Sequence, residues 1–94
     1  MQGSNFLIAY EIHENRKEKL ELITKVIHQF QGLCVQPLET SWIVKTALTP
    51  EEMFSALKTF ALDDHDYLLI TEISENYFGY LKGENWEIIN HHIF

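Results

Sequence analysis

The stretch "NFLIAYEI", residues 5 to 12, decides how this chain folds. Both of its alternating sets of side chains are largely apolar. One set is Phe6, Ile8, Tyr10 and Ile12, and the other is Leu7 and Ala9. Strands of this kind are typical of the middle of a sheet that is covered on both faces. The sequence therefore predicts a central first strand, with a cover needed on each side of it.

A helix is predicted to follow this strand. Asn15 and Glu18 have the spacing of a capping box, which indicates a helix from there to about Gln31. Gly32 is expected to supply the left-handed residue that ends this helix. The side chains expected on its buried stripe are Leu20, Ile23, Ile27 and Phe30.

Two further strands are predicted to form a hairpin. They are "LCVQPLE", residues 33 to 39, and "SWIVKTAL", residues 41 to 48, with only a tight turn between them. Pro37 has no N–H to donate to a neighbouring strand. It therefore predicts that its strand lies at the edge of the sheet or contains a bulge.

A second helix and a fourth strand complete the pattern. Thr49, Pro50 and Glu52 have the order of an N-cap, a first helical residue and the closing acid of a capping box. The side chains that this helix is expected to present to the core are Met53, Phe54, Leu57 and Phe60. "DYLLITEIS", residues 66 to 74, then reads as a strand that is apolar on both faces.

The element order β-α-β-β-α-β predicts an α+β fold, the ferredoxin-like two-layer sandwich. The expected sheet is antiparallel with the strand order 4-1-3-2, so the first and third strands are central and the second and fourth lie at the edges. This domain is expected to span residues 1–82, with an extension at 83–94. Residues 75–82 suit a short fifth strand, and residues 84–94 suit a short terminal helix. Two helices cover only one face, so a second protomer or this terminal segment is expected to cover the other.

Composition narrows the classes of function. Seven basic and fourteen acidic residues give a net charge of −7, which opposes non-specific binding to nucleic acid. The single cysteine, Cys34, cannot form an internal disulfide and indicates a reducing compartment. The chain shows neither an apolar run of membrane-spanning length nor the pattern of a signal peptide. We therefore expect a cytoplasmic location and no membrane partner.

Several segments together resemble a known superfamily. They are the strand end "AYE", the hairpin region "ETSWIVKTALTPEE" and the fourth-strand region "DDHDYLLITEI". They are similar to the Cas-two-like proteins, and the likeness is greater to the stand-alone SinR-like relatives of the small CRISPR-associated endonuclease subunit. The resemblance covers roughly residues 5 to 82. It implies the ferredoxin-like fold and homodimerisation through the open sheet face or the C-terminal strand.

The resemblance also implies one site residue. In the CRISPR-associated members an Asp at the end of the first strand meets its mate across the dimer axis, and the two hold a divalent metal. The matching position here is Glu11, after Tyr10. The longer Glu side chain moves the carboxylate by about an ångström, which disturbs the octahedral geometry that Mg²⁺ requires. The alternative interpretation is a polar strand end that faces Lys45 on the third strand.

Two other groups of residues contain side chains that could bind a metal. "DDHD", residues 63 to 66, matches no known metal-loop spacing and is interpreted as a solvated loop with an Asp turn. His91 and His92 are adjacent and cannot both point the same way. They are therefore interpreted as part of a terminus or a dimer contact rather than as a metal site.

These observations give three hypotheses of function. The first is a non-catalytic homodimeric interaction module with no cofactor and with a protein partner that the sequence does not identify. The second is a metal-dependent nuclease that uses paired Glu11 carboxylates with magnesium or manganese, assisted by His13 or Glu14. The third is an acidic protein that masks the nucleic-acid-binding surface of a partner.

Overall fold

Strand β1 (Ser4–Glu11) lies in the interior of a four-stranded antiparallel sheet, as the sequence predicts. Strand β3 (Ser41–Thr46) pairs with one side of β1, and β4 (Tyr67–Glu72) pairs with the other. Strand β2 (Leu33–Leu38) pairs with β3, so the order is β2-β3-β1-β4. The computed structural model describes residues 3–74, 76, 79 and 83–93. The predicted sheet order is confirmed.

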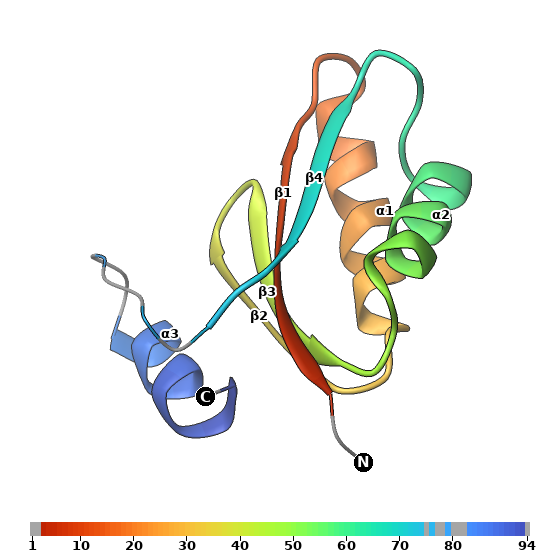
Figure 1. Cartoon of the computed structure of the whole chain (residues 1–94). Coiled ribbons are helices and arrows are strands. Elements are labelled where there is room, and N and C mark those ends of the chain that lie inside the picture. The colour runs from red at the N-terminus through yellow and green to blue at the C-terminus, as the bar shows by residue number, and fades with distance from the viewer. Residues whose placement is uncertain (1–2, 75, 77–78, 80–82, 94) are drawn as a thin grey trace.

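The helices lie on both sides of this sheet (Figure 1). Helices α1 (Arg16–His28) and α2 (Pro50–Phe60) cover one face, which we call the inner face. Helix α3 (Gly83–Ile88) continues into the π-helical turn η1 (Ile89–Ile93) on the opposite side, the outer face. The fold is ferredoxin-like α+β, and the predicted terminal helix is present. Most of the predicted fifth strand, residues 75–82, lies outside the described residues.

The main core fills the space between the inner face and helices α1 and α2. Ile8 at the centre of β1 is completely buried, and so are Ile23 of α1 and Leu57 of α2. Burying a side chain of this size stabilises the fold by about 1.5–3 kcal/mol. The other buried members of this cluster are Phe6, Tyr10, Ile12, Val26, Ile27, Trp42, Val44, Met53 and Ala61.

The helix ends agree with the sequence for α2 and differ for α1. Thr49 and Glu52 form both bonds of a capping box, as predicted. Asn15 instead has a φ of 50°, in the left-handed region, and its side chain makes no capping bond. An N-cap needs extended backbone angles for its side chain to reach the next turn, so the predicted capping box with Glu18 is wrong.

The prediction for the core side of α2 is half right. Met53 and Leu57 are fully buried, but Phe54 is 47% and Phe60 66% exposed. The buried stripe continues from Leu57 to Ala61, one residue beyond the helix, at the four-residue spacing of a helix face. Phe54 and Phe60 flank this stripe, and both large side chains are left on the surface.

Strand β2 shows both features that Pro37 predicted. It lies at one edge of the sheet, and its register with β3 shifts between Val35 and Leu38. A proline and a bulge are two devices that keep an edge strand from pairing with another chain.

Among the described residues, no helix is long and apolar enough to cross a membrane.

Gly32 has a positive φ of 126°, but it does not end α1 as predicted. The helix ends at His28 with a right-handed residue, Gln29, at its C-cap, and Gly32 instead leads into β2. A Cβ atom on Gly32 would lie 1.8 Å from the backbone oxygen of Lys45. The close approach of β2 to β3 therefore needs a glycine at this position.

We predict that Gly32→Ala lowers the free energy of unfolding by about 2 kcal/mol or more, because the added methyl group collides with the β3 backbone. Gly83→Ala is the matched control, since a Cβ there meets nothing within 4 Å. The two variants are compared with the parent protein by urea unfolding. Equal stability of the Gly32→Ala variant and the parent would contradict the account of this turn.

Candidate functional site

The outer face of the sheet is covered over β2 and β3. The terminal helical segment packs there, with Ile89 and Ile93 buried against Val35 of β2 and Ile43 of β3 half-buried beside them. These residues form a second, smaller apolar cluster, separate from the main core. The terminal segment thus supplies part of the cover that the sequence requires for the second face.

The outer face over β1 and β4 has no such cover among the described residues. We call this surface the open half-face, and it consists of Leu7, Ala9, Tyr67, Leu69 and Thr71. The strand register places Leu7 opposite Thr71 and Ala9 opposite Leu69. Leu69 is 64% and Tyr67 66% exposed. Two large apolar side chains therefore lie exposed on regular strands, where sequence patterns usually indicate burial.

Glu11 and His13 lie at one end of the open half-face. Glu11 is opposite Tyr67 in the register, and its Oε2 atom is 2.9 Å from Nε2 of His13. The His13 ring meets the Tyr67 ring edge-on, with centroids 5.9 Å apart. The three side chains form a surface cluster that offers one carboxylate and one imidazole.

Glu14, the third predicted site residue, does not join this cluster. It is exposed on the segment between β1 and α1, and among the described residues no hydrogen bond or ion pair links it to Glu11 or His13. The expected contact between Glu11 and Lys45 is also wrong. The antiparallel register of β1 and β3 places Lys45 opposite Asn5. Asn5 is near the start of β1, whereas Glu11 is at its end, so the two charged side chains lie at opposite ends of the strand.

Within the described ranges, no three His, Cys, Asp or Glu side chains form a group that could hold a metal ion. Glu11 with His13 offers at most one carboxylate and one imidazole from each chain. A divalent cation prefers more oxygen ligands than this. A metal site at Glu11 would therefore need ligands from a second molecule.

Comparison with known proteins does not assign this chain to a family. Comparisons with protein-family models, with curated proteins and with solved structures found no match. The resemblance to the Cas-two-like proteins is therefore a proposal.

The acidic loop at residues 63–66 is more ordered than the sequence indicated. The predicted Asp turn is present, with Asp63 Oδ1 accepting from the backbone N–H of His65 at 2.8 Å. Asp66 is not solvated, however, because its side chain is completely buried. Its Oδ2 accepts from the Asp63 backbone N–H and lies 3.0 Å from Nζ of Lys19.

Lys19 is the residue that the sequence interpretation missed. Its side chain is only 9% exposed, and its ammonium group lies 2.7 Å from Asp63 and 3.0 Å from Asp66. This contact joins the first turn of α1 to the loop before β4. The signal was its spacing, since Lys19 lies four residues before Ile23 and thus on the buried face of the helix.

The three charges shift one another's protonation. The hydrogen bond to Asp63 raises the pKa of Lys19. The same bond, with the backbone N–H of His65, holds the pKa of Asp63 below its usual value. Burial alone would raise the pKa of Asp66, but the Asp63 backbone N–H and Lys19 outweigh burial and lower that pKa. All three groups are therefore charged at neutral pH.

The remaining sequence candidates show no arrangement for chemistry. His91 and His92 are both exposed on η1. Trp42 is buried on the inner face. Cys34 is half-buried, with Sγ 3.8 Å from Nδ1 of His28, and burial raises the pKa of its thiol. A raised pKa favours the unreactive thiol over the thiolate.

We predict that Asp66→Asn lowers the melting temperature more than Asp64→Asn does. The first change leaves Lys19 with a weaker partner in a buried position, whereas the Asp64 side chain is 94% exposed beside Lys58. Thermal unfolding at pH 7, followed by circular dichroism, gives the comparison. Equal losses in the two variants would show that Asp66 contributes no more than a surface charge.

The ion pairs of Lys19 with Asp63 and Asp66 make the stability of the fold depend on pH. A carboxyl group whose pKa is lowered in the folded state stabilises the fold at every pH above its pKa in the unfolded chain, which is about 3.9. This stabilisation is lost as the pH falls through the lower pKa of the folded state. The raised pKa of Lys19 acts at the other end, where stability is lost only as the pH rises above about 10. The melting temperature of the Asp66→Asn variant should therefore fall less between pH 5 and pH 2 than that of the parent.

Proposed function

We propose that this protein is a non-catalytic interaction module that forms a homodimer through the open half-face. The observation that carries the proposal is the unequal cover of the outer face. The terminal segment buries Val35 on β2, while Leu69 and Tyr67 of β4, on the same face of the sheet, stay exposed. The proposed relationship to the Cas-two-like proteins implies a homodimer through the open sheet face or the C-terminal strand, and the first of these agrees with the proposal.

A second copy suits this surface because the central part of the surface is uncharged. Leu7, Ala9 and Leu69 present only hydrocarbon, and Thr71 adds a small hydroxyl group. Two such surfaces related by a twofold axis bring apolar area against apolar area, which is how isologous dimers form. Covering a leucine completely contributes about 1.5–3 kcal/mol.

The overall charge limits the strength of this dimer. Each copy carries a net charge of −7, so association brings like charges together. Added salt screens this repulsion. We therefore infer a weak dimer, with a dissociation constant on the order of 10⁻⁵–10⁻⁴ M, that becomes tighter as the salt concentration rises.

We predict that Leu69→Glu abolishes dimerisation in sedimentation velocity, because the change puts a charge at the centre of the interface. The matched control is Leu22→Glu, at an exposed leucine of α1 on the other side of the molecule. The control should sediment like the parent protein across a series from about 10 to 500 µM. A parent that stays monomeric throughout would contradict the proposal, and so would a Leu69→Glu variant that dimerises like the parent.

A metal-dependent nuclease is the second candidate. One observation favours it, namely that Glu11 and His13 lie at the end of the same half-face. A dimer through this surface would contribute two carboxylates and two imidazoles. Bound magnesium or manganese would then activate a water molecule or stabilise the charge on a phosphate.

Cleavage of RNA and DNA in the presence of magnesium or manganese separates the two candidates. If the module proposal is right, we expect no cleavage by the parent protein above the level of a Glu11→Ala variant prepared identically. Cleavage by the parent that falls at least about a hundredfold in Glu11→Ala would establish the enzyme instead. The sedimentation of both proteins serves as a control, because Glu11 is exposed and its loss should leave the fold intact.

A further inference from the structure

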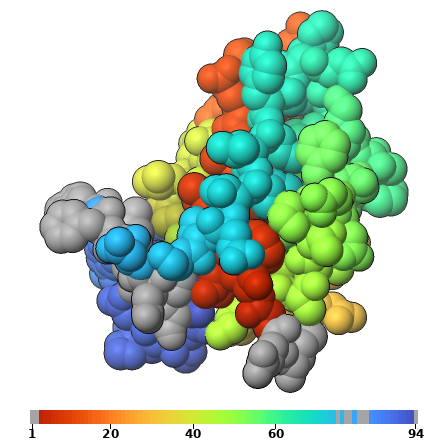
Figure 2. Space-filling view, in the orientation of Figure 1, coloured from red at the N-terminus to blue at the C-terminus, as the bar shows by residue number. Residues whose placement is uncertain are grey.

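The two edges of the sheet differ in how they are protected. Strand β2 carries Pro37 and a shifted register, as described above. Strand β4, "YLLITE", contains no proline and no lysine, and its six residues pair with β1 without a register shift. Figure 2 shows β4 on the molecular surface, with α2 beside it. An edge strand without such devices is open to pairing with another extended chain.

The hydrogen-bonding groups on the free side of β4 can be assigned. The Ile73 backbone N–H donates to the Asn5 oxygen at 2.9 Å, and the register continues in steps of two through Thr71 and Leu69. In an antiparallel pair, the residues between these positions point their N–H and C=O groups away from the partner strand. Within the part of the chain that the structure describes, the free groups of β4 therefore belong to Leu68, Ile70 and Glu72.

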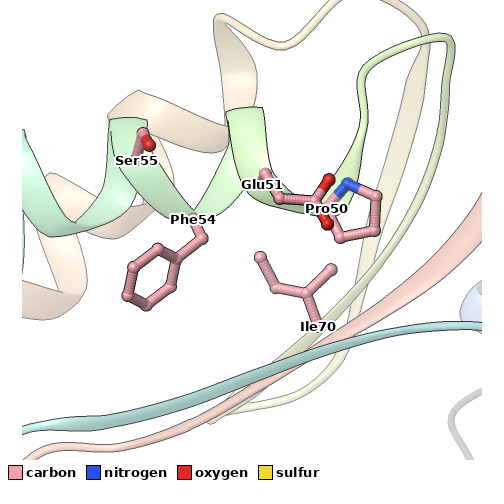
Figure 3. Close-up of a pocket in the computed structure, with 5 residues that line it drawn as sticks. All are labelled: Pro50, Glu51, Phe54, Ser55 and Ile70. Carbon is pink, nitrogen blue, oxygen red and sulfur yellow. The ribbon is translucent and has the colours of Figure 1, made fainter.

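A groove lies next to this free edge on the inner side. It has a volume of about 290 Å³ and is formed by one residue of β4 and the first turns of α2 (Figure 3). Its lining residues are Pro50, Glu51, Phe54, Ser55 and Ile70. Phe54 is 47% exposed. A strand added beside Ile70 would direct every second side chain into this groove, because side chains alternate between the two faces of a sheet.

We propose that the β4 edge and the α2 groove together bind an extended segment of another protein as a fifth strand. An apolar side chain of that segment sits against Phe54 and Ile70, and basic residues flank it. The free N–H and C=O groups of β4 give the affinity, and the groove gives the specificity, as in other cases of strand addition. This site is separate from the open half-face, which involves the side chains of the outer face.

Charge decides the kind of partner. Glu51 lines the groove and Glu72 ends the strand, and no Lys or Arg is among the residues that line the groove. A second copy of this chain would bring another net charge of −7 to this acidic edge. A peptide with lysines at its ends is complementary to the edge, and long-range attraction speeds its binding.

The test uses a blocked nine-residue peptide, Lys-Thr-Val-Thr-Phe-Thr-Val-Thr-Lys, and amide hydrogen exchange measured by NMR on the full chain. At about 1 mM peptide, exchange of the Leu68, Ile70 and Glu72 amides should slow at least about tenfold. The Leu69 and Thr71 amides already pair with β1 and should change little. A matched peptide with glutamate in place of both lysines should bind at least about fivefold more weakly, because it meets the acidic edge with like charge.

Variants on α2 test the groove. Phe54→Glu should weaken binding of the lysine peptide at least about tenfold, whereas Phe60→Glu, a more exposed position outside the groove lining, should leave it unchanged. Circular dichroism checks that both variants fold. The proposal is overturned if the three amides are not slowed at 1 mM peptide, or if the two variants bind alike. Slowing of these amides by a higher protein concentration alone would assign the edge to a second copy and would likewise overturn it.

Discussion

The need to cover two faces of one sheet governs this structure. Helices α1 and α2 can reach only the inner face, where Ile8 and its neighbours form the main core. The outer face has the short terminal segment, which is long enough to cover β2 and β3. The apolar side chains of the β1–β4 half are left without a described cover, and the proposed association of two copies follows from that shortage.

A buried charged side chain holds the loop before β4 against helix α1. Lys19 points from α1 into the loop before β4, where Asp63 and Asp66 neutralise it. Without these ion pairs, the hydrogen bonds within the loop itself would be the main polar contacts that hold it. The ion pairs join it to the first helix. The loop leads directly into β4, the strand that supplies both the exposed side chains of the open half-face and the free strand edge.

The sequence predicts the sheet and its order well, because strand alternation, Pro37 and the Thr49 cap are local signals. It fails where tertiary contacts decide. Asn15 has the residue type of a helix cap, but the chain enters α1 through a left-handed residue. Phe60 is apolar, yet the smaller Ala61 fits against the sheet instead. Lys19 and Asp66 are far apart in the sequence and charged, so only the folded chain shows them as buried partners.

The central claim is that the open half-face binds a second copy of the chain. Dilution of the labelled protein from about 1 mM to 20 µM, followed by two-dimensional ¹H–¹⁵N NMR, tests this claim residue by residue. The account predicts signals that shift with concentration at Leu7, Ala9, Tyr67 and Leu69, and none at Leu22 on the outside of α1. Spectra that stay unchanged over this range, or shifts confined to other surfaces, would contradict it.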